Sequence, residues 1–441
     1  MRALWTALLA IAVVAPARGQ DIAVPEPAPP PGVFERLGVT GALRAGYWSS
    51  TRNLDAERHV GAGMLWLKTS RRVSDHVSFL AEGWTALRGP LEYGDATGEV
   101  REAFVDLRFG RFDVRAGRQI IAWGRADGVN PTDNLSGQDL TLLVPDDADR
   151  RLGTTAVRAS YYAGDVSLTG VWLPEFRGHE FALPAPPPGI ALVRDAERWP
   201  GDQWAVRLEQ TGGAVDWSAS YFRGFDLAPD LGVGVAAGLQ ARFQDQAPVI
   251  HIEHHRVRVL GGDMAANLGR FGLRAEGAYV QSDDPRGRDP FVKNRFVFVV
   301  AGVDRTFGGR LNLNVQYLSR YVLDDPEAGL KTRNDEGATD GGFASGVAAQ
   351  QAILNSQTRH VQHGASFRIA YTWWHETLEA ECAAVTYAHP SGGALRPKVA
   401  YAVTDSWKVL AGAEILRGEA SSLFGLLQGN STGYAELRWS F

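Results

Sequence analysis

Ten charged side chains lie within the stretch from Gly117 to Arg151, where they are interspersed with Trp, Pro and Gly. Val129–Asn134 is dense in turn-forming residues, so we expect an ordered loop. Guanidinium and carboxylate groups that line one narrow space select among charged solutes, which is the chemistry of a pore constriction. The alternative is a surface loop whose aspartates and arginines pair with one another. The constriction candidates are Arg118, Arg125, Asp127, Asp133, Asp139, Arg150 and Arg151.

A second set of charged residues recurs at alternate positions of segments that resemble strands. Alternate side chains of a strand point to opposite faces, so these residues share one face. If the strands close into a membrane barrel, that face lines the lumen. The near balance of signs suits a hydrated pore without strong ion preference, although many of these residues could instead pair across strands as structural ladders. The predicted lumen-lining residues are Arg108, Asp106, Arg158, Arg207, Glu209, Arg274, Glu276, Arg320, Arg368, Arg438 and Glu436, together with Glu102, Asp113, Arg115, Arg258, Glu379 and Glu381.

Motifs for catalysis or metal binding are weak. His251, Glu253 and His255 share a predicted strand face, and His360 and His363 lie near the end of another strand. A metal site needs several such ligands to converge, and these two clusters do not lie on successive strands. The sequence has no Gly-rich phosphate loop, Cys-x-x-Cys-His haem site or Gly-x-Ser-x-Gly elbow. We therefore expect no metal, no cofactor and no enzyme, while a Ser/His pair between loops stays open.

The elements that must position these residues are strands with a two-residue period. Apolar and polar residues alternate through Arg310–Tyr317 and Phe367–Trp373, and no apolar stripe of helical period follows the N-terminal region. Leu231–Phe243 is consistent with either a short helix or a strand extension. The predicted strands are 39–50, 60–71, 76–88, 99–109, 111–123, 153–163, 165–174, 203–211, 214–224, 249–267, 270–282, 293–306, 310–322, 358–373, 376–387, 395–403, 406–417 and 431–441.

The connections between these strands alternate between short and long. Turns at 74–75, 110–111, 164–165, 212–213, 308–309 and 404–405 are short, whereas 124–153, 174–202, 224–248 and 323–357 are long. Short periplasmic turns, long external loops and an even strand count are typical of bacterial barrels. We predict an all-β, transmembrane antiparallel up-and-down β-barrel of about 16–18 strands that occupies residues 39–441 as one domain.

The N-terminal region indicates export. Residues 1–19 have the charged start, short apolar core and small-residue end of a secretory signal peptide. Residues 20–38 are rich in Pro and Ala and are predicted to be a periplasmic lead-in. Cys382 is the only cysteine, so no intrachain disulfide can form. The formal net charge of −5 argues against a nucleic-acid partner.

The C-terminal segment Tyr434–Phe441 resembles the closing strand of bacterial outer-membrane β-barrels. This resemblance implies that Trp439 and Phe441 belong to a signal that the barrel-assembly machinery reads. Gly117-Arg-Gln, Trp123-Gly-Arg and Asn130-Pro, with His254–Met264, resemble segments of large proteobacterial barrels loosely described as alginate-export-like or fatty-acid-porin-like. The resemblance implies insertion into the lipid bilayer of the outer membrane of a Gram-negative bacterium.

These features together predict a porin or channel. It would pass a small or polymeric solute, by diffusion or export, through a hydrated lumen that the third external loop narrows. One alternative is a transporter of a hydrophobic, lipid-like cargo. Another is a barrel that sheathes a periplasmic partner such as a cytochrome. A homo-oligomer and a periplasmic or inner-membrane transport partner both stay open at this stage.

Overall fold

The computed structural model describes residues 38–50, 58–88, 96–183, 186, 188–194, 199, 201–235, 248–324 and 341–441. The predicted signal peptide and nearly all of the predicted lead-in lie outside these residues and stay predictions.

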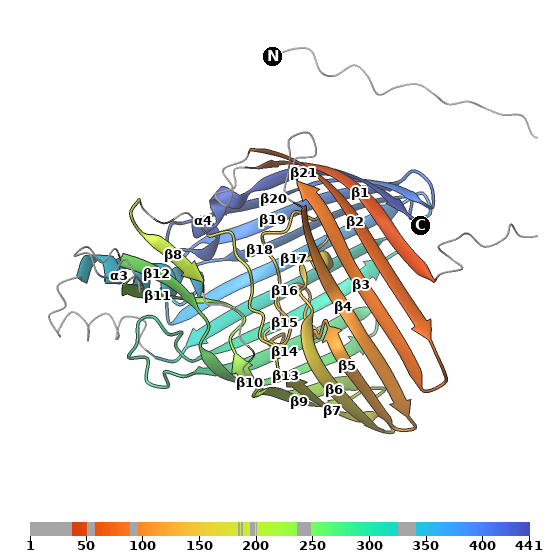
Figure 1. The fold of residues 1–441 in the computed structure, drawn as a ribbon, viewed down its shortest axis with the longest axis horizontal. Helices are drawn as coiled ribbons and strands as arrows, with labels where there is room; N and C mark the ends of the chain where they lie inside the picture. Colours follow the sequence, from red (N-terminus) through yellow and green to blue (C-terminus); the bar gives the residue numbers. More distant parts are fainter. Residues whose placement is uncertain are drawn as a thin grey trace, which may run out of the picture.

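Eighteen strands form one closed antiparallel sheet (Figure 1). Each strand pairs with its neighbours along the chain, and β21 pairs with β1 through nine residue pairs from Ala42–Ser440 to Ser50–Thr432, which closes the ring. The predicted fold class is therefore confirmed, with the upper strand number. The strands are β1 Val39–Ser50, β2 His59–Arg72, β3 Val77–Arg88, β4 Ala96–Phe109, β5 Phe112–Gln119, β6 Thr154–Ala163, β7 Val166–Leu173, β9 Gln203–Gln210, β10 Val215–Phe225, β13 Arg256–Leu268, β14 Phe271–Ser282, β15 Phe296–Phe307, β16 Leu311–Val322, β17 Val361–Trp373, β18 Leu378–Tyr387, β19 Gly392–Ala402, β20 Trp407–Gly418 and β21 Thr432–Ser440.

A smaller sheet and a helix lie at the long-loop end of the barrel (Figure 1). The sheet contains β8 Ala191–Arg194, β11 Asp230–Val235 and β12 Pro248–Glu253. Helix α3 Gly341–Leu354 packs on it through Val347 and Leu354, and these four elements are called the cap below. Among the described residues, neither α3 nor any other helix is long and apolar enough to cross a membrane.

The cap corrects three details of the sequence interpretation. The predicted strand 249–267 is two strands in two sheets, because Ile250 and Ile252 pack within the cap instead of continuing the barrel wall. The ambiguous 231–243 segment is strand up to Val235, and residues 236–247 lie outside the described part. Helix α3 was not predicted, since its sequence has two adjacent glycines at its start and no clear apolar stripe, so packing against the cap decides its structure.

The outer face of the barrel is apolar at alternate positions. On β13, Leu260 is 60% exposed and Leu268 is 68% exposed, whereas Val259 is 3% exposed on the inner face. An exposed apolar band of this kind is the lipid-facing surface of a transmembrane barrel. Arg258 shares the face of Leu260 and therefore points outward, so its predicted lumen position is wrong. The pattern misled us because outward residues beyond the apolar band are free to be charged.

β5 ends at Gln119 rather than at residue 123. The backbone N–H of Ile120 donates to the Glu102 carboxylate (3.0 Å) instead of continuing the ladder toward β6. The chain therefore leaves the barrel wall at Ile120 and returns to it at Thr154. We call this segment, 120–153, loop 3.

The closing seam gives a first prediction. Phe441 donates its N–H to Gly41 O (3.0 Å), accepts from Gly41 N–H (2.9 Å), and has its ring 5.1 Å from that of Trp439. Deleting Phe441 removes both hydrogen bonds and this ring contact, so we expect a several-fold lower yield of folded barrel, measured by heat-modifiable electrophoretic mobility. Ser440→Ala is the control and should fold normally. A Phe441 deletion that assembles at wild-type yield would contradict the prediction.

Candidate functional site

Loop 3 is bound to two groups of barrel strands. At its start, Arg125 contacts carboxylates of β9, β10 and β13. Later in the loop, Asp146 contacts Lys398 of β19 and Arg438 of β21. In the ring these two groups are separated by β14–β18 on one side and by β1–β7 on the other. The loop is therefore held between well-separated parts of the inner wall.

Glu276 of β14 is the anchor at the start of the loop. One carboxylate oxygen accepts from the N–H groups of Arg125 (2.9 Å) and Ala126 (3.0 Å), and the other accepts from the N–H and hydroxyl of Thr132 (both 2.8 Å). Gly124 has φ +98°, and a Cβ there would lie 2.5 Å from the same carboxylate. The turn therefore needs glycine for its backbone conformation and for the close approach. Four hydrogen bonds satisfy a carboxylate that is only 2% exposed.

The Arg125 side chain extends this anchor. Its Nε donates to Asp263 (2.7 Å) and one terminal nitrogen donates to Glu209 (2.6 Å). Arg207 also donates to both of these carboxylates, at 3.2 Å each. Two arginines thus compensate two inner-wall acids, one of which, Asp263, is nearly inaccessible to solvent. Charges that are this buried are tolerated only when they are paired and hydrogen-bonded.

The far part of the loop carries the opposite charge pattern. Asp146 pairs with Lys398 (3.1 Å) and Arg438 (3.0 Å), and Asp149 pairs with Arg44 of β1. Burial opposes ionisation of Asp146, but the two cations hold its pKa below the ordinary value. The wall on this side is mainly basic where it meets the loop, and the loop brings aspartates to it.

A β-bulge adds a further contact to this part of the loop. The register between β3 and β4 shifts at Glu82 and Gly83, which leaves Arg101 as the extra residue. Arg101 donates to Glu82 (2.6 Å) and to the carbonyl of Ala148 in loop 3 (2.6 Å). Its guanidinium also stacks 4.7 Å from the Trp66 ring. The bulge thus re-aims one side chain from the wall to the loop.

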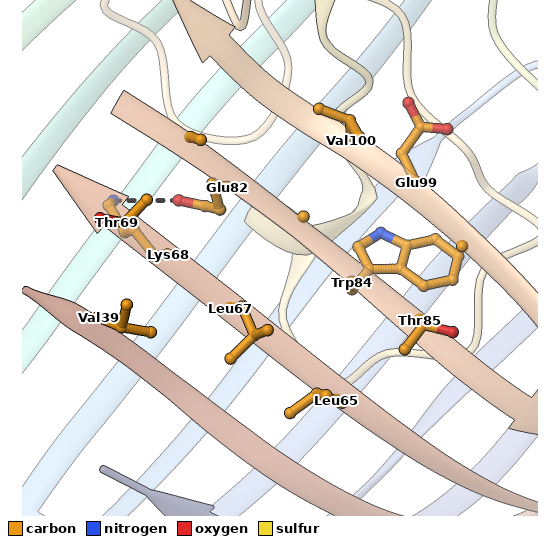
Figure 2. A pocket seen from close by; sticks show the side chains of 13 residues that line it. Val39, Leu65, Leu67, Lys68, Thr69, Glu82, Trp84, Thr85, Glu99 and Val100 are labelled. Carbon is orange, nitrogen blue, oxygen red and sulfur yellow. Dashed lines mark ion pairs between the residues drawn. The ribbon is translucent and has the colours of Figure 1, made fainter. Parts of the chain in front are cut away.

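The opposite side of the same wall region has an apolar groove of about 580 Å³ (Figure 2). Leu65, Leu67 and Val100 line it from the outer face, and Gly83 and Gly98 leave its floor without side chains. The β3–β4 ladder is continuous on both sides of the bulge. The groove therefore lies at the bulge, and Lys68, Glu82 and Trp84 of the inner-facing positions border it together with the outer-face residues.

Apolar packing supplements the charges. Ile121, Trp123 and Leu135 of loop 3 are buried against inner-face residues such as Phe222 and Val259. The inner face near the long-loop end is consequently apolar, which differs from the uniformly polar face expected from alternation. Burying side chains of this size stabilises by roughly 1.5–3 kcal/mol each, an upper estimate for a barrel interior.

The segment 174–183 packs against loop 3 and leads into the cap. Glu180 and Gln138 are joined by a backbone hydrogen bond (2.9 Å), and His179 Nδ1 accepts from the Gln138 N–H (3.0 Å). On its other side, His179 donates its N–H to Leu227 O (2.7 Å). Burial lowers the pKa of His179 to about 4, so the ring is neutral at pH 7 and its Nδ1 is available as an acceptor.

The structure distributes the constriction candidates among separate pairs. Arg151 pairs with Asp133 (2.7 Å) inside the loop, Arg150 pairs with Glu414 (2.7 Å), and Arg118 pairs with Glu175 (3.1 Å). Arg151–Asp133 is a pair within the loop, as the alternative expects, whereas Arg150 and Arg118 pair with residues outside the loop. That these charges form a constriction stays a prediction. The other candidates also have partners: Arg125 binds the inner-wall acids, Asp139 accepts from Thr141, and the Asp127 backbone lies within hydrogen-bond distance of the Gln316 amide.

Most predicted lumen residues lie on the inner face in local pairs. Arg115–Asp106 (2.6 Å), Arg368–Glu381 (2.6 Å) and Arg438–Glu436 (2.8 Å) join neighbouring positions. Their role in solute passage stays a prediction. Of the remaining predicted lumen residues, Arg207 and Glu209 lie beside Asp263, Arg274 donates to Arg125 O, and Glu102 accepts from the Ile120 N–H. Arg320 donates to Asn355 O and stacks on Phe296. In the strand registers Arg108 is opposite Asp113 and Arg115 is opposite Arg158, while Glu379 lies two residues before Glu381.

Several residues that hold the loop were missed. Asp263 was detectable, because it alternates with Leu260 and Met264 on β13. Arg101 was not, because the bulge breaks the alternation that would have marked it. The other missed residues are Arg44, Glu82, Glu99, Asp146, Asp149, Glu175, Arg177, Arg396, Lys398 and Glu414.

With this geometry established, comparison with known proteins identifies the family. Residues 81–323 match a family model described as "Protein of unknown function (DUF1302)". The chain belongs to this family. No curated protein matches it.

Solved structures share the fold of this DUF1302 barrel. The outer membrane protein OpdK of Pseudomonas aeruginosa has 11% identity and a TM-score of 0.54, with 91% of this chain and 98% of that chain covered. OccAB3 of Acinetobacter baumannii has 9% identity and a TM-score of 0.53, with 91% and 98% covered. OccK5 (OpdH) of Pseudomonas aeruginosa has 10% identity and a TM-score of 0.52, with 91% and 96% covered. The porin-like barrel that the sequence predicts is confirmed at the level of fold.

The histidine clusters do not converge on a metal site. Within the described part of the chain, no group of three or more His, Cys, Asp or Glu could hold a metal ion. His255 instead pairs with Asp230 (2.8 Å), and His363 lies 2.6 Å from the Tyr317 hydroxyl. The hydrogen bond to Asp230 raises the pKa of His255 despite its burial.

The anchor at Glu276 gives the second prediction. Glu276→Ala leaves three loop N–H groups and the Thr132 hydroxyl without their acceptor, and hydrogen bonds to a charged group contribute about 1.5–3 kcal/mol each. We expect the amides of Arg125, Ala126 and Thr132 to exchange with deuterium about 100-fold faster. Glu379→Ala on β18 is the control, because Glu379 is an inner-face carboxylate outside this anchor. Unchanged exchange in Glu276→Ala would show that apolar packing alone holds the loop.

His179 gives the third prediction. Its pKa is lower in the folded protein (about 4) than the ordinary 6.5, so the unfolded state binds more protons between these values. Its stabilising contribution is complete above pH 6.5 and is lost as the pH falls toward 4, by about 1.4 kcal/mol per pH unit at most. We expect the Gln138 amide to lose protection over this window, after correction for intrinsic exchange. His179→Gln keeps an acceptor without titrating in this range and should flatten the profile. Equal pH profiles in the two proteins would contradict this prediction.

Proposed function

We propose that this DUF1302 barrel is a diffusion channel of the outer membrane of a Gram-negative bacterium, and that loop 3 narrows its hydrated lumen. The single observation that carries the proposal is the attachment of loop 3 to two separated parts of the inner wall, through Arg125 on one side and Asp146 on the other. A loop fixed in this way reduces the open cross-section without closing the barrel.

The charges around the loop support a hydrated path for small solutes. Charged side chains of both signs surround loop 3 and are paired with one another, so the interior offers hydrogen-bonding groups to a polar solute while the net charge stays small. The solved OpdK structure holds vanillate, which makes vanillate a reasonable probe molecule for this channel as well. We propose passage of small polar organic solutes rather than of polymers, because the loop occupies part of the lumen.

The other candidate functions have less support. A lipid-like cargo would need a lateral opening, and the outer groove over β2–β4 is where one would be sought, but β3 and β4 stay paired on both sides of the bulge at Glu82 and Gly83. A sheath for a periplasmic partner would need an open interior, which loop 3 and its apolar contacts partly fill. Assembly would follow the route of other outer-membrane barrels, with Trp439 and Phe441 as the recognised end.

The fourth prediction tests the channel and its narrowing together. We expect refolded wild type to give stable single-channel steps in planar bilayers, and a variant with residues 126–148 replaced by a short Gly-Ser linker to give a several-fold larger conductance. The reason is that ionic conductance rises with the open cross-section of a hydrated pore. Val399→Ala is the control, because Val399 is 46% exposed on the outer face of β19 and the substitution leaves loop 3 and the inner-face charges intact; it should keep the wild-type step size.

Two outcomes would count against the proposal in different ways. Wild type that conducts at no voltage would reject the channel. Wild type and the loop-replacement variant with equal conductance would leave a channel but would remove loop 3 from its narrow part. Adding vanillate on one side and recording transient current blocks then tests the solute class.

A further inference from the structure

Two arginines lie side by side on the outer face of the barrel. Arg223 of β10 and Arg258 of β13 are register partners, and both side chains are exposed. Neither forms a hydrogen bond or salt bridge with any residue that the structure describes. Asp202, whose carboxylate is also stabilised by the charge of Arg223, is paired with Arg256 at 2.8 Å. Like charges directly opposite each other destabilise a strand pair unless an anion lies between them.

The strand registers place this pair within a row of side chains across β9, β10, β13 and β14. The row reads Trp204, Arg223, Arg258 and Gln281. Gln281 Oε1 accepts from the Tyr279 hydroxyl (2.9 Å), so its amide nitrogen can donate elsewhere. An anion above the arginines would therefore meet two guanidinium groups and an amide, beside an indole ring.

The neighbouring row toward the middle of the barrel is apolar and aromatic. It reads Val206, Tyr221, Leu260 and Tyr279, and the Tyr221 ring lies 5.2 Å from that of Trp204. Tyr and Trp on the outer face of a barrel mark the interface between hydrocarbon and headgroups. The arginines are two residues farther along their strands, about 7 Å toward the long-loop end. They therefore lie at the level of lipid headgroups.

A third row lies below the aromatic one. This row contains Leu208, Ala219, Gly262 and Gly277. Because the last three have little or no side chain, the outer surface of β10, β13 and β14 is low at this level. A hydrocarbon chain that descends from the arginines would pass beside Tyr221 and Leu260 and then lie over these small residues. The basic pair and the shallow surface below it thus match the two parts of an anionic amphiphile.

We propose that Arg223 and Arg258 bind the phosphate group of a lipid in the leaflet on the long-loop side, with an acyl chain of that lipid over Ala219, Gly262 and Gly277. Arginine suits this ligand, because its planar guanidinium presents parallel donors to two phosphate oxygens. Of the acids in the row above, Asp202 is paired with the Arg256 guanidinium, and Asp283 accepts a hydrogen bond from the Arg256 backbone N–H (3.3 Å). This site is independent of what passes through the lumen.

The test is lipid retention by the full chain, refolded in a zwitterionic detergent and measured by native mass spectrometry. The probes are dioleoyl phosphatidic acid, dioleoylglycerol with the same chains, and inorganic phosphate. We expect wild type to retain phosphatidic acid and to release dioleoylglycerol. The variant R223Q/R258Q should bind phosphatidic acid roughly 10- to 30-fold more weakly, since each cation near a lipid surface contributes on the order of 1 kcal/mol.

The controls separate charge, geometry and source of the phosphate. Arg72→Gln is the control for charge. Arg72 lies at the short-turn end of β2, beside the inner-face residues Asp106 and Arg108, and this variant should bind phosphatidic acid like wild type. R223K/R258K keeps the charge but loses the paired donors, so an intermediate affinity is expected. Undiminished binding by R223Q/R258Q would overturn the proposal, with heat-modifiable mobility used to show that the variant is folded. Displacement of the lipid by an equal concentration of inorganic phosphate would also overturn it, because the site would then bind a free anion.

Discussion

The carboxylate of Glu276 and the ion pair between Arg125 and Asp263 are the contacts on which the interior of this barrel depends. All three groups are largely withdrawn from solvent, and each would be costly to bury alone. Together they fix the backbone of loop 3 where it leaves β5. The remainder of the loop then reaches Lys398, Arg438 and Arg44 with aspartates at the required positions. The loop is therefore electrostatically complementary to two differently charged parts of one wall.

The barrel wall and the loop contribute different kinds of stability. The wall has a closed ladder, so no backbone donor or acceptor faces lipid at a free edge. Its apolar residues need no partner other than the hydrocarbon around them. The interior has the reverse requirement, because charged side chains are compensated by other charged side chains. The Arg101 bulge connects the two, since a local irregularity of the wall supplies a cation to the loop.

The wall could be predicted from the sequence in detail, and the interior only in part. Alternation marks Leu260 and Val259 as opposite faces whatever their neighbours are, so strands and turns follow from local pattern alone. The loop was recognisable from its composition, and Arg125 was named as a candidate. Its partners could not be named, because Arg125 meets Asp263 across 138 residues of chain. The predictions that Arg258 faces the lumen and that Ile250 belongs to a barrel strand were wrong for a related reason. Near the end of a strand, the alternation of polar and apolar residues does not tell which surface a side chain faces or which sheet the strand joins.

The long separation in sequence between the loop and its basic wall has a kinetic consequence. Asp146 and Arg438 are 292 residues apart, and Arg150 and Glu414 are 264 residues apart. Contacts between residues this far apart in the sequence form only after the chain between them has folded into place. Loop 3 therefore reaches its final place after β19, β20 and β21 have joined the sheet. Until then its aspartates stay hydrated, and a nascent barrel whose later strands are delayed would be wider inside than the finished one.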